Sequence, residues 1–297
     1  MNRLFISGGA GLLGSNWAII KSHVSEVIVN LHRRQFDFPN LHSSNVNLMN
    51  IDDIKSFFIK NRPNQVVNTV ALTSIEVCEE DPDLAYRTNV VVAKNLAIVC
   101  DLLKIKFIHI STDNLYSDGV PWSDEAKKMS PCNKYGYTKM LSEFEVMNCC
   151  PDAIVVRTNF YGKGANDKKS FSDLIIESVR SQKKIQLFND VFYTPITMNS
   201  LIELVDALIQ VNFTGVINVA GRERLSKYDF GVRLSAFLGL DERFIESVSI
   251  SQRPDLVARP REMSLSTDLL QGTIGRKPPS INEDFQIMSA YCQGRKL

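Results

Sequence analysis

A glycine-rich turn near the N-terminus limits what this chain can fold into more than any other feature of its sequence. The apolar run 4–7 leads directly into Gly8-Gly9-Ala10-Gly11-Leu12-Leu13-Gly14, so glycines recur at Gly8, Gly11 and Gly14. In a dinucleotide-binding unit, one such glycine allows a tight turn, one lets a pyrophosphate approach the backbone, and one lets the next helix lie close on the sheet. The N-terminus of that helix then faces the anion. A purely structural glycine turn is the alternative, but a place between strand and helix favours a cofactor site.

Short β-branched runs alternate with amphipathic segments through the first half of the chain. The expected strands cover residues 4–7, 26–31, 65–70, 107–110 and 153–157. The expected helices cover residues 52–60, 84–103 and 133–147. Strands and helices in alternation predict an α/β fold with a doubly wound parallel sheet, the Rossmann arrangement.

The pattern loosens after residue 158, where helix-like segments at 170–181 and 227–238 stand among irregular sequence. We therefore expect a dinucleotide-binding domain over residues 1–158 and a smaller, mainly substrate-binding C-terminal domain over residues 159–297. A return of some later segments to the Rossmann core stays open.

Charge and composition exclude several classes of protein. Lys and Arg number 34 against 33 Asp and Glu, so no strong global field would attract nucleic acid or an acidic membrane. No segment approaches the roughly 18 apolar residues of a membrane span, and the N-terminus has no signal-peptide pattern. The six cysteines form no C-x-x-C pair and no metal-ligand cluster. We expect a cytoplasmic protein with reduced thiols, no metal, and no nucleic-acid or membrane partner; a homodimer stays open.

The end of the second expected strand bears on the choice between NADH and NADPH. NAD-type sites usually place an acidic residue about 20 residues after the glycines, where it holds the ribose 2′-hydroxyl. This chain has Asn30 there, followed by His32, Arg33 and Arg34. Two guanidinium groups suit a 2′-phosphate, which a carboxylate would repel. NADPH is the expected cofactor, with NADH and a basic turn that binds no ligand as alternatives.

Three further segments are expected at the cofactor site. Asn47, with Leu48 beside it, is placed to contact the adenine amino group, although a plain turn is an equal alternative. The strand end Val70-Ala71-Leu72 offers small apolar backbone over the ribose and nicotinamide. Asn89 is expected to fix the helix 84–103 against that segment.

Tyr135 and Lys139 are four residues apart in the expected helix 133–147, so both side chains share one helix face. A phenol has an unperturbed pKa of about 10. A neighbouring ammonium lowers that pKa, which brings the phenol closer to exchanging a proton at neutral pH. Carbonyl reduction needs such a proton donor. The spacing alone is a weak signal, because both residue types are common on helix surfaces.

Taken in order, the motifs resemble those of the extended short-chain dehydrogenase/reductase family, and within it the dTDP-4-dehydrorhamnose reductase branch. The resemblance covers most of the chain. It rests on the glycine turn, Val67 to Thr73, Ser111-Thr112-Asp113, Pro131 to Lys139, Arg157-Thr158-Asn159, Asn189-Asp190, Thr194-Pro195 and Ala258-Arg259-Pro260.

The resemblance implies a role for each matching residue. Thr112 would hydrogen-bond the substrate carbonyl, Tyr135 would donate the proton, and Lys139 would bind the nicotinamide ribose and lower the pKa of the phenol. The implied cofactor contacts are Gly8, Gly11, Leu12, Leu13, Gly14, Asn47, Leu48, Val70, Ala71, Leu72 and Asn89. The implied substrate contacts are Thr73, Thr112, Asn114, Asn159, Tyr193 and, for the diphosphate, Arg259.

Two departures from the family pattern bear on function. Asn114 stands where an aromatic residue is usual and where a dehydratase carries Glu, and Leu72 replaces another usual aromatic residue. Without that Glu, elimination lacks its base. The leading hypothesis is therefore an NADPH-dependent reductase of the keto group of a nucleotide-linked deoxysugar. The alternatives are an epimerase or dehydratase on the same fold, or a non-catalytic NADP-binding regulatory subunit.

Overall fold

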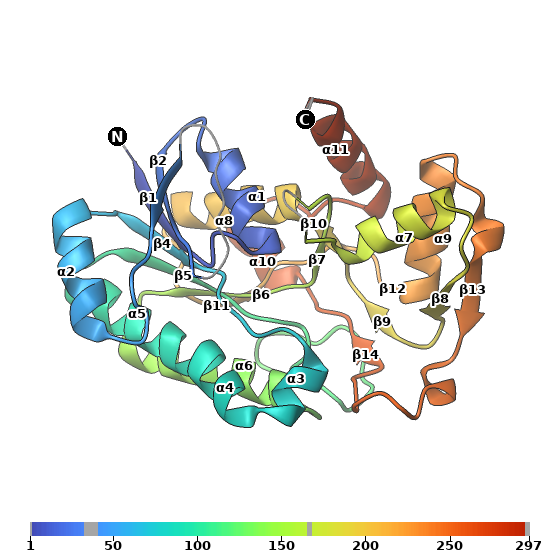
Figure 1. The fold of residues 1–297 in the computed structure, drawn as a ribbon, viewed down its shortest axis with the longest axis horizontal. Helices are drawn as coiled ribbons and strands as arrows, with labels where there is room; N and C mark the ends of the chain where they lie inside the picture. The colour runs from blue at the N-terminus through green and yellow to red at the C-terminus, as the bar shows by residue number, and fades with distance from the viewer. Residues whose placement is uncertain (1, 33–40, 165–167, 295–297) are drawn as a thin grey trace.

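A parallel sheet of seven strands forms the centre of the larger part of the molecule (Figure 1). The computed structural model describes residues 2–32, 41–164 and 168–294. The sheet order is β11-β6-β5-β4-β1-β2-β3, and every neighbouring pair is parallel. The strands are β1 (Arg3–Ser7), β2 (Glu26–Asn30), β3 (Leu41–Ser44), β4 (Gln65–Asn68), β5 (Lys106–Ile110), β6 (Ile154–Arg157) and β11 (Gly215–Asn218). The doubly wound α/β fold predicted from the sequence is confirmed.

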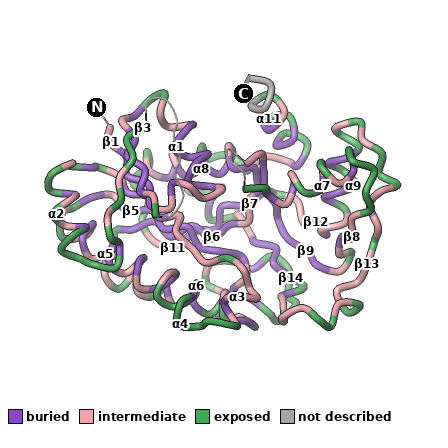
Figure 2. The backbone as a smooth tube through the Cα atoms, viewed as in Figure 1, coloured by how far each residue is buried: buried purple, intermediate pink, exposed green. Residues whose placement is uncertain are grey.

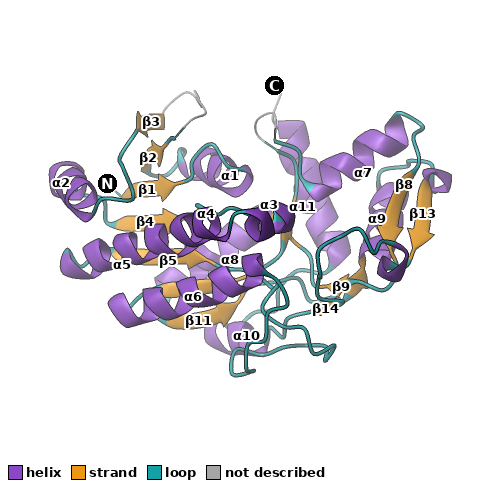
Figure 3. Ribbon diagram, turned by 60° about the horizontal axis from the view of Figure 1, so that its bottom comes forward, coloured by secondary structure: helices purple, strands orange, loops and turns teal. Residues whose placement is uncertain are grey.

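Helices cover both faces of this sheet, as Figure 3 shows. One face carries α1 (Leu12–Lys21) and α8 (Met198–Gln210), and the other carries α2 (Ile51–Asn61), α5 (Val92–Leu102) and α6 (Lys134–Cys149). Strand side chains alternate between the two layers: Leu4 and Ile6 join the first core, whereas Phe5 joins the second. Burial on both faces explains why the central strands are continuous apolar runs.

Two strands of the sheet were missed in the sequence. β3 is an edge strand whose residues are all partly or fully exposed, so it lacks an apolar pattern. β11 lies beyond residue 158, yet it pairs with β6, from Gly215 opposite Ile154 to Asn218 opposite Arg157. Helix α8 packs against α1. Later segments therefore do return to the Rossmann core.

The helix expected over residues 84–103 is three elements. They are α4 (Pro82–Tyr86), a π-helical turn η1 (Arg87–Val91) and α5. The π turn adds a residue to the helix, and Asn89 within it is fully buried. Helix α3 (Ile75–Glu80) precedes α4 and begins at a Ser74 cap.

A smaller lobe, formed by residues 171–193 and 225–263, stands at the carboxyl ends of the sheet strands (Figure 1). It contains α7 (Phe171–Arg180), β8 (Ile185–Phe188), β9 (Phe192–Tyr193), β12 (Leu225–Ser226), α9 (Lys227–Phe237), η2 (Glu242–Phe244), β13 (Ile245–Val248), η3 (Ile250–Gln252) and β14 (Glu262–Met263). β7 (Phe160–Tyr161) pairs with β10 (Ile196–Thr197), and α10 (Asp268–Ile274) and α11 (Ile281–Gly294) follow the lobe. The core of the lobe is aromatic: Phe230 packs edge-on against Tyr161 of β7 and Phe285 of α11.

Figure 2 shows buried backbone running through the sheet and into the lobe. No helix in the described part of the chain is long and apolar enough to cross a membrane. The five cysteines whose side chains are described are free thiols.

Candidate active site

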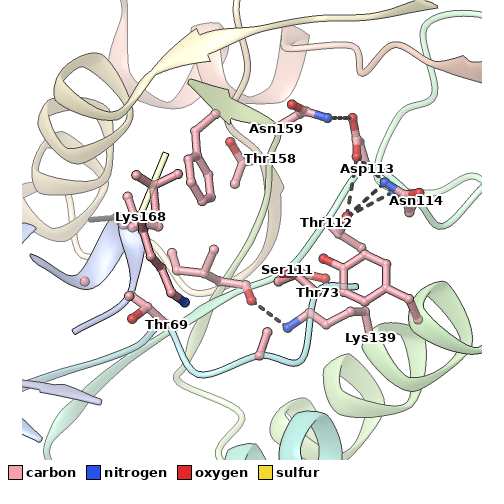
Figure 4. Close-up of a pocket in the computed structure, with 18 of the residues that line it drawn as sticks. Thr69, Thr73, Ser111, Thr112, Asp113, Asn114, Lys139, Thr158, Asn159 and Lys168 are labelled. Atoms are coloured by element: carbon pink, nitrogen blue, oxygen red, sulfur yellow. Dashed lines mark hydrogen bonds between the residues drawn. The ribbon is translucent and has the colours of Figure 1, made fainter. Parts of the chain in front are cut away.

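Three adjoining cavities lie at the carboxyl ends of the strands, and one of them extends to the lobe. The catalytic cavity, of about 490 Å³, is lined by the glycine turn, the end of β5 and the start of α6 (Figure 4). The glycine-loop cavity, of about 940 Å³, shares Gly11, Thr69 and Ala71 with it. The lobe cavity, of about 280 Å³, shares Asn114 and Asn159 with it. Together they could hold an extended ligand. They lie near the carboxyl ends of parallel strands, where α/β folds bind ligands.

The glycine turn is shaped for close approach of a ligand. Gly8 has φ of +74°, and a Cβ there would meet Thr69 Oγ1 at 2.9 Å. A Cβ at Gly14 would clash with the Gly8 carbonyl. Gly11 precedes α1 with no side-chain cap, so the first N–H groups of α1 face the cavity without a competing side chain. Gly11, Leu12, Leu13 and Gly14 all line the catalytic cavity, and Gly8 lines the glycine-loop cavity.

The end of β2 is closed by Asn30. Its side chain accepts hydrogen bonds from Val46 N at 2.7 Å and Ser44 Oγ at 3.0 Å, and donates one to the Val46 carbonyl at 3.1 Å. Asn30 and His32 both line the glycine-loop cavity. Arg33 and Arg34, on which the preference for NADPH was based, lie outside the described residues.

The other expected cofactor contacts divide into two groups. Asn47, Leu48, Val70 and Ala71 line the glycine-loop cavity, as expected of cofactor contacts. Leu72 and Asn89 line none of the three cavities.

Asn89 makes its hydrogen bonds within the protein. Its Oδ1 accepts from Leu72 N at 2.7 Å, and its Nδ2 donates to the Leu72 carbonyl at 3.2 Å and to Thr138 Oγ1 at 2.9 Å. Both N–H donors of the amide are therefore used, and its oxygen accepts one hydrogen bond. Direct cofactor contact by Asn89 stays a prediction, while its side chain ties the segment after β4 to helix α6 through Leu72 and Thr138.

Thr112, Tyr135 and Lys139 all line the catalytic cavity. Thr112 follows β5, and its Oγ1 accepts from Asn114 N at 3.2 Å. Tyr135 and Lys139 lie on α6, whose N-cap Asn133 accepts from Gly136 N. Lys139 Nζ donates to the Ile110 carbonyl at 2.7 Å (Figure 4). The predicted helix thus brings both side chains to the end of β5.

The protonation of Tyr135 differs from the expectation. Burial raises the pKa of Tyr135 to about 12, although a hydrogen bond with Thr112 acts in the opposite direction. Burial also lowers the pKa of Lys139 to about 8, against the opposing effect of Glu143. The expected lowering of the phenol pKa by Lys139 is wrong here, because the amine is bonded to Ile110 and desolvation dominates. A phenol with a raised pKa stays protonated at neutral pH and can serve as a proton donor.

His109 is a structural residue beneath this cavity, in line with its place in an apolar strand. Asn68 Oδ1 accepts from Ser7 Oγ and Val70 N, so its Nδ2 must be the donor to His109 Nδ1 at 3.1 Å. His109 Nε2 then carries the proton and donates to Ser142 Oγ at 3.0 Å, while Ser142 donates to the Lys139 carbonyl and Lys139 Nζ lies 3.3 Å from the same ring nitrogen. Burial and Lys139 hold the pKa of His109 well below its usual value, as this neutral form requires.

A buried ion pair supports the same region. Arg157 of β6 pairs with Glu143 of α6 at 2.7 Å, and both side chains are below 5% exposed. Glu143 also accepts from Ser111 Oγ, and Arg157 donates to the Tyr116 hydroxyl at 2.7 Å. Ser111 is therefore part of this buried network. The sequence analysis missed the Glu143–Arg157 pair, whose members lie on separate elements.

The expected substrate residues are only partly brought together. Thr73, Asn114 and Asn159 line the catalytic cavity, and Asn159 donates to the buried Asp113 at 2.6 Å (Figure 4). Burial raises the pKa of Asp113.

Arg259 and Tyr193 have different surroundings. Arg259 lines the lobe cavity and forms an ion pair with Glu76 of α3. Tyr193 lines none of the three cavities; it is 1% exposed and belongs to the lobe core. The ring of Tyr193 on β9 is turned into the lobe core, and its direct contact with substrate stays a prediction.

Comparison with known proteins gives one family for nearly the whole chain. The family model described as RmlD substrate binding domain matches residues 1–292. The chain is 28% identical to a protein of Haloferax volcanii named a probable low-salt glycan biosynthesis reductase, over 96% of this chain and 97% of the relative. It is 25% identical to a dTDP-4-dehydrorhamnose reductase of Mycolicibacterium smegmatis, over 89% of this chain and 78% of the relative.

Solved structures share the fold at lower sequence identity. A dTDP-4-dehydrorhamnose reductase of Bacillus anthracis, in complex with NADP, superposes with a TM-score of 0.84 at 23% identity, covering 98% of this chain and 100% of that one. A UDP-glucose 4-epimerase of Thermotoga maritima, with UDP-glucose, gives a TM-score of 0.82 at 18% identity, with 98% and 99% covered. Because reductases and an epimerase are similarly close, these likenesses show the fold alone.

Proposed function

This chain belongs to the RmlD substrate binding domain family, and from that premise we propose that it reduces the keto group of a nucleotide-linked deoxysugar with NADPH, using Tyr135 as proton donor. It is an NAD(P)-dependent oxidoreductase of the extended short-chain dehydrogenase/reductase type. The family leaves the sugar, the nucleotide and the role of each side chain to be argued from the site.

One arrangement carries the proposal. Thr112, Tyr135 and Lys139 line the same cavity as the glycine turn Gly11–Gly14. A proton donor and a dinucleotide-binding turn around a single space are what hydride transfer to a carbonyl requires.

The residues present fit a dinucleotide. The turn leaves no room for a Cβ at Gly14, and the first N–H groups of α1 have no side-chain cap. These features suit a pyrophosphate. Asn47 and Leu48 would then lie beside the adenosine end, and Ala71 beside the nicotinamide end.

The side chains divide the reduction between them. When bound, the nicotinamide supplies the hydride. The Thr112 hydroxyl would donate a hydrogen bond to the ketone oxygen, and the Tyr135 O–H would give its proton to the alkoxide that forms there. Lys139 Nζ donates to the Ile110 carbonyl and lies 3.3 Å from His109 Nε2, which leaves at least one N–H for a ribose hydroxyl.

Asn114 favours reduction over dehydration. Its Nδ2 donates to Asp113 Oδ1 at 2.9 Å, and an amide at this position cannot act as the base for elimination. An epimerase retains its nicotinamide and returns it unchanged, so net consumption of NADPH separates that alternative from a reductase.

The test follows nicotinamide absorbance with NADPH and dTDP-4-dehydrorhamnose, the substrate named for several relatives, alongside other 4-keto sugar nucleotides. We expect stoichiometric NADPH oxidation, and a large loss of rate in Tyr135→Phe with NADPH binding retained. A protein that binds NADPH but oxidises none with any keto sugar would overturn the proposal and favour the regulatory subunit. Arg33→Ala with Arg34→Ala should raise the KM for NADPH and leave that for NADH nearly unchanged; equal effects would contradict the preference for NADPH.

A further inference from the structure

We propose that Lys227 is a substrate-binding residue whose ammonium donates hydrogen bonds to the diphosphate of the nucleotide sugar in the lobe cavity. This rests on the proposed function, because it assumes that the keto sugar occupies the catalytic cavity next to it. The argument uses the position of Lys227, the surroundings of its amine and the second cation nearby.

The backbone of Lys227 is held firmly. Lys227 is the first residue of α9, where Ser226 and Asp229 form a capping box. Its N–H donates to the Val191 carbonyl at 3.0 Å. The side chain therefore starts from a fixed point in the lobe.

The amine of Lys227 lies over aromatic rings. Its Nζ is 3.2 Å from the centroid of the Tyr193 ring and 5.1 Å from that of Phe171. Aromatic faces attract a cation but accept no conventional hydrogen bond that would satisfy three N–H donors. Among the described residues, Nζ makes no hydrogen bond or ion pair, although the charge of Asp113 acts on it. The rings thus hold an ammonium whose donors remain available to a ligand.

The cavity beside this amine adjoins the reaction centre. Lys227 and Arg259 both line the lobe cavity, which shares Asn114 and Asn159 with the catalytic cavity. A sugar beside Tyr135 would place its diphosphate in this direction. Two cations suit a group that carries two phosphates.

The two cations differ in what ligand binding would cost. Arg259 is already paired with Glu76, so a phosphate would have to compete with a carboxylate. Lys227 forms no ion pair with any described residue, although the charge of the buried Asp113 acts on its amine. We therefore expect Lys227 to contribute more of the affinity than Arg259.

The simplest rival is a structural lysine that only stabilises the lobe through its aromatic contacts. Lys227→Met keeps most of the aliphatic stem and removes the charge, whereas Lys227→Arg keeps the charge. Lys184→Met is the matched control, since Lys184 lies on the same lobe but is 72% exposed and paired with Glu246.

The first measurement is calorimetric binding of dTDP, UDP and GDP to the NADP-loaded full-length protein. We expect at least one to bind, and Lys227→Met to weaken that binding roughly ten- to a hundredfold, with Lys184→Met unchanged. Equal binding by wild type and Lys227→Met, with both variants folded by circular dichroism, would overturn the proposal, as would no binding of any of the three diphosphates to the wild type.

The second measurement is the pH dependence of that binding. Burial lowers the pKa of Lys227 to about 8, with Asp113 opposing the shift. The ionisable groups around the amine are Asp113, the Tyr193 phenol and Arg259, while Asp229 on α9 itself is turned to Ser226. Affinity in the wild type should fall as pH rises through 8, and the fall should be much smaller in Lys227→Arg. Lys139 titrates in the same range, so an identical fall in Lys227→Arg would assign the effect elsewhere and count against Lys227.

Turnover separates failure of this inference from failure of the proposed function. Keto-sugar reduction with an unchanged KM in Lys227→Met would contradict the role of Lys227 but leave the proposed reductase activity standing. Diphosphate binding that depends on Lys227, without any turnover, would support the role of Lys227 and contradict the proposed reductase activity.

Discussion

Polar groups beneath the catalytic cavity, which we call its floor, are hydrogen-bonded, whereas polar groups of the lobe leave donors unused. Beneath the catalytic cavity, His109, Glu143 and Arg157 are buried and each is bonded to several partners. In the lobe, the Tyr193 hydroxyl is buried with no hydrogen-bond partner among the described residues, and Lys227 Nζ makes only aromatic contacts there. A bonded network fixes geometry before a ligand arrives, as catalysis needs. Open donors let the lobe respond to the ligand, as substrate selection needs.

The largest expected effect is on the chemical step at the catalytic floor. Tyr135→Phe removes the proton donor and should lower kcat roughly 10²- to 10⁴-fold, because general acid catalysis contributes about that much. Dissociation constants for NADPH, measured by fluorescence, should change little. A kcat within twofold of the wild type would show that Tyr135 is not the proton donor.

Substitutions in the buried Glu143–Arg157 ion pair test whether the residues of the floor depend on one another for stability. Arg157→Met leaves the Glu143 carboxylate buried and uncompensated, which should cost about 3–5 kcal/mol in the free energy of unfolding, measured by urea denaturation. Pairing it with Glu143→Leu should recover much of that loss, because the stranded charge is gone. A loss below about 1 kcal/mol in the single variant would contradict a tightly coupled floor.

A third prediction concerns Asp284 of α11, which joins the lobe core to the sheet half. It accepts from Thr197 N and Oγ1 and from Ser200 Oγ, and burial raises its pKa to about 6. The folded protein then holds a proton that the unfolded chain loses near the ordinary aspartate pKa of 3.8, so this residue's contribution to stability falls as pH rises from about 4 to 6. In Asp284→Asn that contribution is absent, so the difference in unfolding free energy between the two proteins should change by roughly 2–3 kcal/mol across the interval. A difference that stays constant with pH would show that the carboxyl is ionised throughout.

The smallest effect is expected on the solvent-exposed surface of the lobe. Lys184→Met breaks the ion pair with Glu246, which should change the free energy of unfolding by about 0–1 kcal/mol, because water screens exposed charges. A change as large as that of Arg157→Met would remove the contrast between buried and exposed pairs.

The residues that the sequence analysis placed well are those whose position follows from local pattern. The glycine turn directly follows an apolar run, and Thr112 stands at the end of another, so a parallel sheet brings both to one edge. Tyr135 and Lys139 needed only the helical period.

The features that the sequence did not indicate depend on contacts between distant segments. Tyr193 lies on a two-residue strand paired with β12 and β14, and no local pattern shows that this pairing turns the ring inward. The sequence Ser226-x-x-Asp229 is a capping-box signal that could have placed Lys227 at the start of a helix. Its aromatic neighbours, Phe171 and Tyr193, come from two other elements and could not be read from that segment. The raised pKa of Tyr135 likewise depends on burial, which spacing does not reveal.

The π-helical turn Arg87–Val91 makes the catalytic region sensitive to chain length. A π turn holds one more residue than an α turn, so deleting Thr88 would allow an ordinary α-helix to run through. The helical segments on either side would keep their facing, but the residues inside the turn would change position. Asn89 would leave Leu72 and Thr138, although no residue that lines the catalytic cavity had been changed. A single-codon deletion there should therefore be more harmful than most substitutions at the same positions, and relatives that lack the extra residue would need another way to tie the segment after β4 to α6.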